Sequence, residues 1–547
     1  MTSLTDKVDE LFAEWNKPDS PGCALAIIKG GEMVYKRGYG MADLERNVPI
    51  SPASVFDLGS TGKQFTAMLI VILAEQGFLS LDDSIHQTIP EMPAYEQPIT
   101  LRHLIHHTSG LRDYTTLMEM SGRPCENFYY EDELLDLICR QKELNFKPGE
   151  EYLYSNTGYF LLGVIAKRVT GKPFPELLRE HLLEPLGMRA TDLNDDARRI
   201  VKNRAIGYSP REGDGYCTDM SLCGGYGDGA ILSTVEDLFL WDQNFYNNKL
   251  GGGGQELIQK VHAPGELNSG ERLDYAFGLF VSDYRGLRRV AHAGGWAGYR
   301  SELVRFPDQE FSVICLTNLG SVSPSRLAQQ VADLYLADQF TEQAPGPGVP
   351  AFSELAANRI ERITGLYRNR RTGSVLRLST REGKLIGEVF GLSLPTVATS
   401  STHLKAVESP FDLEVDLEEP QWENEQTISV MLDEGKPEPY QKMTAIPITP
   451  LQLAEYVGDY HSDELDISYQ VLLEGEHLFL KRGYSPQEAL QPMTVDLFTG
   501  REAEFEFERD EQNQICAFQL GAGRVRNIRF AKWGPSTNRV QPAHCEM

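Results

Sequence analysis

Several absences narrow the classes to which this sequence can belong. No run of about 18 consecutive apolar residues occurs, which is the length that a membrane-spanning helix needs, so we do not expect membrane insertion. Basic residues are scarce: 52 Lys and Arg face 79 Asp and Glu, and the formal net charge is −27. Because such a charge repels a phosphate backbone, and no basic stripe interleaved with aromatic residues offsets it, nucleic acid is not an expected partner.

Paired cysteines and a targeting signal are missing as well. The eight cysteines are scattered, without a C-x-x-C pair or the spacing of a disulfide framework, so we interpret them as reduced thiols that are mostly buried. The first residues, Met1 to Lys7, contain neither the basic start nor the apolar stretch of a secretory signal. These observations predict a cytoplasmic protein.

Two motifs that could indicate ligand sites are incomplete. His103 and His107 would share a helical face near His106, but no carboxylate or cysteine at ligand spacing completes a metal coordination shell. The glycine-rich segment 224–229 lacks the lysine that follows a phosphate-binding loop, so a tight turn bordering a cleft is expected there. We therefore predict neither a metal nor a cofactor.

The length of 547 residues exceeds what one hydrophobic core supports, so two or three domains are expected. The first part of the chain has strand-type runs at both ends and helical patterns between them. Strands are expected at 23–28, 33–39, 276–283, 288–293, 299–306 and 310–318, and helices at 63–76, 131–142, 158–169 and 323–336. This order predicts an α+β domain over residues 1–338, built on an antiparallel sheet with a helical cluster.

A proline- and glycine-rich segment at 339–352 follows this domain, and we interpret it as a linker. Beyond it, short alternating strands prevail. Gly365-Leu366-Tyr367 and Gly458-Asp459-Tyr460 each precede a similar pattern, which indicates an internal repeat. Two small, lipocalin-like antiparallel β-barrel domains are therefore expected, at 353–446 and 447–547.

Ser60 and Lys63 form the first motif with a clear chemical meaning, because they stand three residues apart at the start of an apolar helical pattern. Residues at this spacing share a helix face, so the two side chains can touch. A serine hydroxyl becomes a nucleophile when a neighbouring base takes its proton, and a lysine in a partly dry pocket can be that base. Taken alone, the motif also fits an ordinary helix start, so the surrounding sequence has to distinguish a catalytic pair from a structural one.

Two further segments supply groups that such a nucleophile needs. Tyr154 and Asn156 are expected on a loop before a helix; a phenol beside a lysine can relay protons, and a carboxamide can bind an amide. The segment His292-Ala293-Gly294-Gly295 is expected on a strand, where glycines permit close approach of another backbone and His292 adds a cationic or hydrogen-bonding group. In isolation, a packed tyrosine, a capping asparagine and a structural histidine are the simpler interpretations.

Taken in order, S-x-x-K at 60–63, Y-x-N at 154–156 and H-x-G at 292–294 resemble the penicillin-recognising serine hydrolases, the serine β-lactamase-like family that includes the S12-type peptidases. Many members of that family have K-T-G as the third element. The resemblance covers residues 1–338 and implies the β-lactamase/transpeptidase-like fold. It also implies that Ser60 attacks a carbonyl, that Lys63 and Tyr154 shuttle protons, and that Asn156 holds the substrate amide, before water hydrolyses the acyl-enzyme.

The same resemblance implies how substrate is bound. His292 would take the electrostatic role of the family's lysine, and the backbone amides of Ser60 and Gly295, the residue after Gly294, would form the oxyanion hole. The architecture with two C-terminal β domains is similar to that of the D-aminopeptidases, in which a loop from the last domain reaches the active site. The matching loop would be about 482–491, with Glu488 as a partner for a substrate ammonium.

The sequence leaves several functions open. The resemblance favours a serine hydrolase that releases an N-terminal D-amino acid from small amides or peptides; an esterase of small acyl esters needs only the acylation machinery. A β-lactamase or D,D-carboxypeptidase is disfavoured, since no signal directs export. A non-catalytic, penicillin-binding-like ligand-binding protein is the alternative from another class. The expected partner is a small molecule or short peptide, and the additional β surface allows a homodimer.

Overall fold

The computed structural model describes most of the chain. The described residues are 3–125, 127–196, 198–211, 213, 215–224, 226–341, 355, 357–369, 371–381, 383–389, 392–407, 413–417, 427–432, 437–443, 448–483, 486–500 and 503–533. Most of the linker predicted at 339–352, and the predicted domain boundary at 446, lie outside these residues. The described part contains no helix long and apolar enough to cross a membrane.

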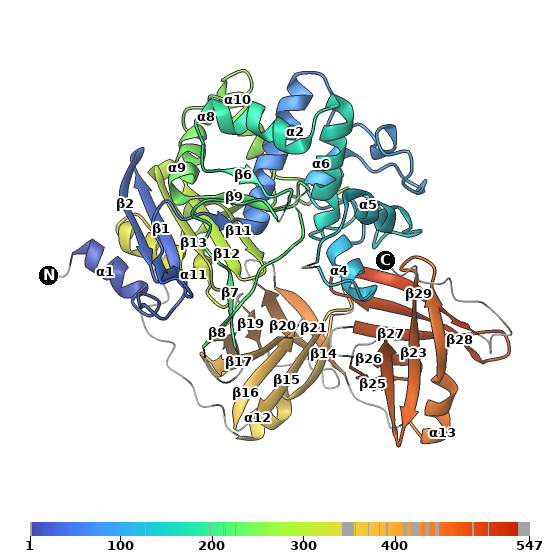
Figure 1. The fold of residues 1–547 in the computed structure, drawn as a ribbon. Helices are drawn as coiled ribbons and strands as arrows, with labels where there is room; N and C mark the ends of the chain where they lie inside the picture. The colour runs from blue at the N-terminus through green and yellow to red at the C-terminus, as the bar shows by residue number, and fades with distance from the viewer. Residues whose placement is uncertain are drawn as a thin grey trace.

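A six-stranded antiparallel sheet forms the centre of the first domain (Figure 1), in the order β10-β11-β12-β13-β1-β2. The strands are β1 (Cys23–Lys29), β2 (Glu32–Tyr39), β10 (Phe280–Tyr284), β11 (Leu287–Trp296), β12 (Tyr299–Phe306) and β13 (Phe311–Thr317). Strand β1 shows why the sheet is covered on both faces, because alternate side chains of a strand point to opposite sides. Leu25 and Ile27 belong to one buried cluster and Ala24 and Ala26 to another.

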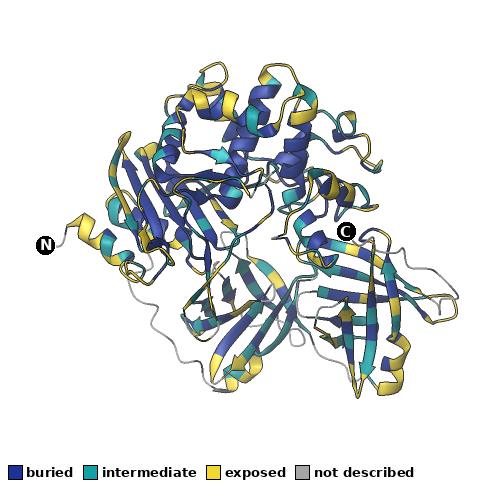
Figure 2. Ribbon diagram, viewed as in Figure 1, coloured by how far each residue is buried: buried dark blue, intermediate teal, exposed yellow. Residues whose placement is uncertain are grey.

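Helices cover the two faces of this sheet. Helices α1 (Leu4–Leu11) and α11 (Pro324–Tyr335) pack on one side. The other side carries α2 (Lys63–Glu75), α3 (Leu101–Ile105), α4 (Tyr114–Met120), α5 (Glu131–Cys139), α6 (Asn156–Thr170), α7 (Phe174–Leu178), α8 (Glu184–Leu186), α9 (Val235–Asn244) and α10 (Gln255–Val261). Every residue of α2 from Lys63 to Leu73 is buried, whereas α1 exposes its outer face (Figure 2). A helix that is apolar all round belongs in a core, and α2 is that central helix.

Two element boundaries differ from the sequence-based expectation. Strand β10 begins at Phe280 instead of Ala276, because the Ala276 amide bonds the Leu279 carbonyl in a turn at 2.7 Å. Gly278 in this turn has φ +71°, and a Cβ there would lie 2.6 Å from the Gln64 nitrogen, so the turn abuts the start of α2. Helix α6 begins at Asn156 instead of Gly158, which places this carboxamide on the first turn of a helix.

Two closed eight-stranded antiparallel barrels follow, as predicted. The first contains β14 (Gly365–Arg368), β15 (Val375–Arg381), β16 (Lys384–Val389), β17 (Leu392–Ala398), β18 (His403–Ala406), β19 (Leu413–Asp416), β20 (Thr427–Leu432) and β21 (Glu438–Met443). The second contains β22 (Gly458–Ser462), β23 (Ile467–Glu474), β24 (His477–Arg482), β25 (Glu488–Thr494), β26 (Leu497–Thr499), β27 (Ala503–Arg509), β28 (Ile515–Ala522) and β29 (Val525–Trp533). Short helices, α12 (Ala357–Ile363) and α13 (Pro450–Leu453), precede them.

The internal repeat extends to individual contacts in the two barrels. The hydroxyl of Tyr367 donates to the carbonyl four residues earlier at 2.7 Å, and Tyr460 does the same in the second barrel at 2.7 Å. The ammonium of Lys442 lies 5.8 Å from the Tyr367 ring centroid, and that of Lys532 lies 5.6 Å from the Tyr460 ring centroid. The Gly-x-Tyr signal in the sequence therefore marks the same closing contact of each barrel.

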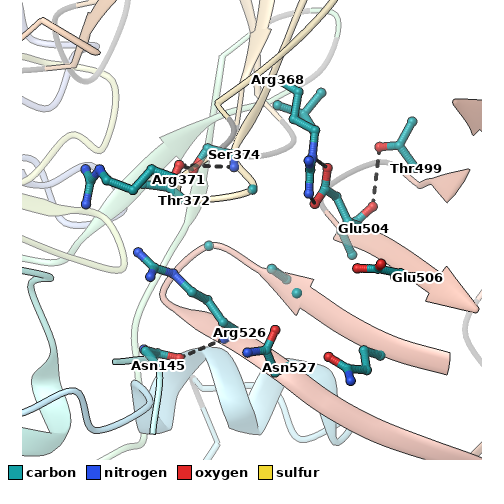
Figure 3. A pocket seen from close by; sticks show the side chains of 17 residues that line it. Asn145, Arg368, Arg371, Thr372, Ser374, Thr499, Glu504, Glu506, Arg526 and Asn527 are labelled. Carbon is teal, nitrogen blue, oxygen red and sulfur yellow. Dashed lines mark hydrogen bonds and ion pairs between the residues drawn. The ribbon is translucent and has the colours of Figure 1, made fainter. Parts of the chain in front are cut away.

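The barrels meet each other and the helical part of the first domain around a polar cavity of about 290 Å³ (Figure 3). Arg368 of the first barrel pairs with Glu504 of the second, with one contact at 2.8 Å. Arg371 of the first barrel and Arg526 of the second both pair with Glu151 of the first domain, at 2.9 and 3.2 Å. The three domains are thus joined by charged contacts at one junction.

Candidate active site

Ser60 and Lys63 lie where the chain enters the central helix. The 3₁₀ turn Gly59–Gly62 carries Ser60 and continues directly into α2, whose first residue is Lys63. The Lys63 Nζ lies 3.0 Å from the Ser60 Oγ, although the lysine is completely buried. Neighbours three residues apart on a helical turn meet in this way, so the sequence spacing places a base against a hydroxyl.

Two carbonyl oxygens fix the Lys63 side chain. Its Nζ donates to the Asn156 Oδ1 at 2.8 Å and to the Asp228 backbone carbonyl at 2.6 Å. Two acceptors occupy two of the three hydrogen-bonding directions of an amine, and the third points to Ser60. When the amine is neutral, its lone pair is therefore directed at the hydroxyl whose proton it has to take.

Tyr154 covers this pair from the side. The Lys63 Nζ is 5.0 Å from the Tyr154 ring centroid, and the His107 ring packs against the phenol with 4.2 Å between centroids. The Tyr154 hydroxyl is buried and has no hydrogen-bond partner among the described residues. A buried hydroxyl without a partner is uncommon and points to a group that a bound molecule satisfies.

His292 lies on β11 as expected, but its surroundings make it neutral. Burial, followed by repulsion from Lys63, lowers the pKa of His292 to about 3. Its Nδ1 lies 2.6 Å from the Ala293 carbonyl and its Nε2 lies 3.1 Å from the Tyr275 hydroxyl. Nδ1 therefore carries the proton and Nε2 accepts one. Of the two roles expected for His292, cationic or hydrogen-bonding, this environment favours the hydrogen-bonding one.

Glycines allow β11 to approach the Ser60 turn closely. A Cβ on Gly294 would lie 1.9 Å from the Leu58 carbonyl oxygen, and a Cβ on Gly59 would lie 2.7 Å from the Gly295 nitrogen. Gly59 also has φ +50°, in the left-handed region that favours glycine. The Thr61 hydroxyl, 2.9 Å from the His292 carbonyl, ties the turn to the strand. The Ser60 turn and the Gly295 amide are thus neighbours, which is the arrangement that an oxyanion hole requires.

Asp113 is a residue of the site that sequence reasoning missed. Its buried carboxylate accepts the Asn156 backbone amide at 2.6 Å and the Thr116 amide at 3.2 Å. It therefore caps α4 and holds the start of α6 at the same time, which positions the carboxamide that contacts Lys63. Its segment follows the Thr108-Ser109-Gly110-Leu111 sequence, but nothing in the local pattern shows that it would reach Asn156.

A cavity of about 230 Å³ opens beside Ser60. It is lined by Gly59, Ser60, Tyr114, Thr115, Asn156, Cys223, Gly224, Asp228, Gly229, Ala230, Gly295, Trp296 and Arg524. The glycine-rich segment 224–229 borders it through Gly224, Asp228 and Gly229, as the tight turn was expected to do. The Asp228 carboxylate, whose pKa is raised by burial, accepts the Tyr114 hydroxyl at 2.8 Å.

The C-terminal barrel reaches this cavity, but not through the segment expected from the sequence. Glu488 lies on β25 instead of a loop, pairs with Arg482 at 3.1 Å, and is absent from the described residues that line the cavity. The β28–β29 turn takes that place and contributes Arg524. The registers of eight strands decide which turn faces the first domain, and a local alignment of 482–491 does not contain that information.

Two curated proteins are similar to this chain over much of its length. The D-aminopeptidase of Gluconobacter oxydans is 27% identical over 453 residues, which cover 82% of this chain and 80% of the relative. Penicillin-binding protein 4* of Bacillus subtilis is 32% identical over 314 residues, which cover 54% of this chain and 68% of the relative.

Two solved structures share the fold. An octameric penicillin-binding protein homologue from Pyrococcus abyssi has a TM-score of 0.57 at 24% identity, over 80% of this chain and 99% of that one. The D-amino acid amidase of Ochrobactrum anthropi has a TM-score of 0.52 at 23% identity, over 61% of this chain and 99% of that one. A family model for beta-lactamases matches residues 8–336, the part that holds Ser60, Lys63, Tyr154 and His292. With this match and this geometry, the chain belongs to the beta-lactamase family.

Proposed function

We propose that this serine hydrolase forms an acyl-enzyme at Ser60 and releases the N-terminal D-amino acid of short peptides or amides. The observation that carries the proposal is the contact of 3.0 Å between the buried Lys63 Nζ and the Ser60 Oγ, at the wall of a small cavity. The D-aminopeptidase relative, which aligns with both the first domain and much of the barrels, supports the substrate class.

Acylation starts at the Ser60 hydroxyl. Neutral Lys63 takes its proton while the oxygen attacks the substrate carbonyl, and the amides of Ser60 and Gly295 stabilise the negative charge of the tetrahedral intermediate. Tyr154 passes its proton to the leaving nitrogen as the C–N bond breaks, and takes one back from the Lys63 ammonium. Water then attacks the acyl group by the reverse sequence of proton transfers.

Three further residues hold the substrate in this scheme. Asn156 presents its carboxamide to the substrate amide, and Gly294 keeps the strand edge close to the nucleophile. His292 acts as a neutral hydrogen-bonding group, since its pKa of about 3 leaves it uncharged at neutral pH. Glu488 is not assigned a role at the site, because Arg482 holds its carboxylate on the second barrel.

Hydrolysis of D-alanine and L-alanine p-nitroanilides and of p-nitrophenyl acetate tests the proposal, with Ser60→Ala in parallel. We expect D-selective amide cleavage that is lost in Ser60→Ala. Cleavage of the ester alone would replace the proposal with an esterase of small acyl esters. Equal turnover of the D- and L-amides would remove the stereochemical part, and no turnover at all would indicate a binding protein.

We further propose a cytoplasmic location and a homodimer, with a small molecule or short peptide as the only other partner. The seven cysteines within the described residues are all free thiols, which fits a reducing compartment. Fractionation of cells that produce the protein, and sedimentation of the purified chain, test the two statements; a monomer at all concentrations would refute the second.

A further inference from the structure

The turn between β28 and β29 of the C-terminal barrel lies at the catalytic cavity. Gly523 and Arg524 form this turn, and a Cβ on Gly523 would be 4.0 Å from the Thr116 side chain of α4. The carbonyl of Arg524 accepts the Asp113 backbone amide at 3.5 Å. The barrel therefore presents its turn to the segment that also supplies the Asp113 carboxylate.

Two side chains of the first domain hold this hairpin in place. The Asn145 carboxamide donates to the Arg524 carbonyl at 2.9 Å and accepts the Arg526 amide at 2.8 Å, a contact seen in Figure 3. Buried Arg112 donates to the Arg526 and Asn527 carbonyls at 3.0 and 2.8 Å. Because the Arg524 carbonyl and the β29 backbone that follows it are bonded to the first domain, the backbone position of Arg524 at the edge of the cavity is fixed.

The Arg524 guanidinium lies over the Tyr154 ring, 4.8 Å from its centroid. Its nearest carboxylate is that of Asp113 at 3.8 Å, and that carboxylate already accepts the Asn156 and Thr116 amides. Among the described residues the guanidinium makes no hydrogen bond, and the side chain is 42% exposed. A guanidinium has five N–H donors, so most of them remain available to a molecule in the cavity.

The charge at this cavity is unlike that of the whole protein. The chain carries a net charge of −27, yet Arg524 brings a cation to the wall of the Ser60 cavity. The Asp228 carboxylate at its wall accepts the Tyr114 hydroxyl, and the Asp113 carboxylate near Arg524 accepts the Asn156 amide. A cation with free donors suits an anionic group of the substrate and disfavours an ammonium at the same position.

We propose that Arg524 binds a carboxylate on the leaving-group side of the substrate, which makes short peptides with a free C-terminal carboxylate, dipeptides above all, the preferred substrates. The side is set by Tyr154, because Arg524 stacks on the residue that protonates the leaving nitrogen, and in a dipeptide the carboxylate is attached to the carbon next to that nitrogen. The assignment rests on the proposed function for Tyr154; the binding of the carboxylate itself does not require turnover.

Binding by an inactive chain tests this proposal. Isothermal titration calorimetry of full-length Ser60→Ala compares D-alanyl-D-alanine with D-alanyl-D-alaninamide, which lacks the carboxylate. We expect the free peptide to bind more tightly, and the added Arg524→Ala change to weaken it about 10- to 100-fold, the size of a charge-assisted pair, while the amide is unaffected. Arg524→Lys should restore only part of the loss, because it keeps the charge without the planar fork.

Arg529→Ala is the matched control, because it removes the same charge from the same hairpin; Arg529 is half exposed and pairs with Glu508 at 3.1 Å. It should leave both dissociation constants unchanged. Equal weakening of both ligands by Arg524→Ala, or binding of neither ligand to Ser60→Ala, would overturn the proposal. Failure of the proposed function appears separately, as lack of turnover by the wild-type chain despite the expected difference in binding.

The kinetic pH profile of Arg524→Ala tests an indirect role. If Arg524 acted only by favouring the phenolate of Tyr154, the variant would lower kcat equally for the free peptide and its amide and would shift the alkaline limb of the profile. We expect instead a rise in KM confined to the free peptide. The equal loss of kcat would overturn the assignment as a substrate-binding residue.

Discussion

At the scale of single residues, Lys63 is the group on which the chemistry depends. It is completely buried and its Nζ contacts Ser60, Asn156 and the Asp228 carbonyl. Lys63→Met keeps the length of the side chain but removes the base, so kcat/KM on the D-alanine amide should fall about 10²- to 10⁴-fold. Steady-state kinetics measures this, with circular dichroism to verify folding. A variant that retained more than a tenth of the activity would show that another group takes the Ser60 proton.

His292 gives a prediction about pH. Its pKa is about 3 in the folded chain, while an unfolded histidine has a pKa of about 6.5, so between these values only the unfolded state takes up the proton. His292 therefore favours unfolding increasingly as the pH falls from about 6.5 toward 3. Urea denaturation measures the free energy of unfolding at pH 7 and at pH 5. From pH 7 to pH 5 this free energy should fall by about 2 kcal/mol more in the wild type than in His292→Gln.

The control is the same substitution at an exposed histidine, His477→Gln on β24, which should show the wild-type difference between pH 7 and pH 5. If His292→Gln lost as much stability as the wild type between the two pH values, His292 would have to be protonated in the folded chain. The role as a neutral hydrogen-bonding group would then be wrong.

The sequence predicted the residues that local spacing determines. Ser60 and Lys63 share a turn because they are three apart at a helix start, and Tyr154 and Asn156 flank the start of the next long helix. The contact of Lys63 with Asn156, 93 positions away, was not predicted, because the resemblance assigned Asn156 only to the substrate amide. Asp113 was missed because its importance comes from the backbone amide that it caps, and any short segment can contain such an aspartate.

At the scale of elements, the contact between β11 and the Ser60 turn predicts different effects for two adjacent glycines. A Cβ on Gly294 would lie 1.9 Å from the Leu58 carbonyl oxygen, whereas a Cβ on Gly295 would meet only the flexible Arg300 side chain at 3.1 Å. Gly294→Ala must push the strand from the turn, and displacements near 1 Å can reduce a rate about 10²-fold. We expect such a loss in kcat for Gly294→Ala and a much smaller one for Gly295→Ala.

Both glycine variants should be compared with Gly252→Ala, a surface position where a Cβ meets nothing within 4 Å. Thermal unfolding of the three separates general destabilisation from displacement of the nucleophile. Equal kcat values for Gly294→Ala and Gly295→Ala would show that the turn does not depend on the close approach of β11.

Elements with strong local patterns were predicted well, and errors arose where tertiary contacts act. The hairpin of β1 and β2 follows from two apolar runs around Gly30-Gly31, and the structure places it within a residue of the expected bounds. The predicted start of β10 at Ala276 was wrong, because Gly278, which the pattern treats as part of a strand, turns the chain against α2. Hydrophobic periodicity contains no information about such a contact.

At the scale of the whole molecule, the position of the last barrel is the feature that the sequence predicted least. That a segment of this barrel reaches the catalytic cavity was anticipated, but Glu488 was chosen instead of Arg524. The relevant turn depends on contacts such as Asn145 with Arg524, which are separated by 379 positions. These contacts form only when two complete domains dock.

The buried ion pair of Arg112 and Glu464, at 2.8 Å, is the strongest candidate for what holds that docking. The Arg112 side chain is completely buried and also bonds the hairpin that carries Arg524. Glu464→Ala leaves a buried guanidinium without its counter-charge, so it should lower the free energy of unfolding by about 3–5 kcal/mol. Asp82→Ala, which breaks the exposed pair with Arg102, should cost at most about 1 kcal/mol.

The effect on activity should follow from the same docking. In Glu464→Ala, Arg112, one of the two side chains that hold the hairpin, loses the carboxylate that pairs with it. Arg524 is then less firmly held over Tyr154, and KM for D-alanyl-D-alanine should rise more than KM for its amide. Urea denaturation and steady-state kinetics on both substrates measure the two consequences. If Glu464→Ala behaved like Asp82→Ala in both, the barrel would be positioned by other contacts, and the charged junction around Glu151 would be the next to remove.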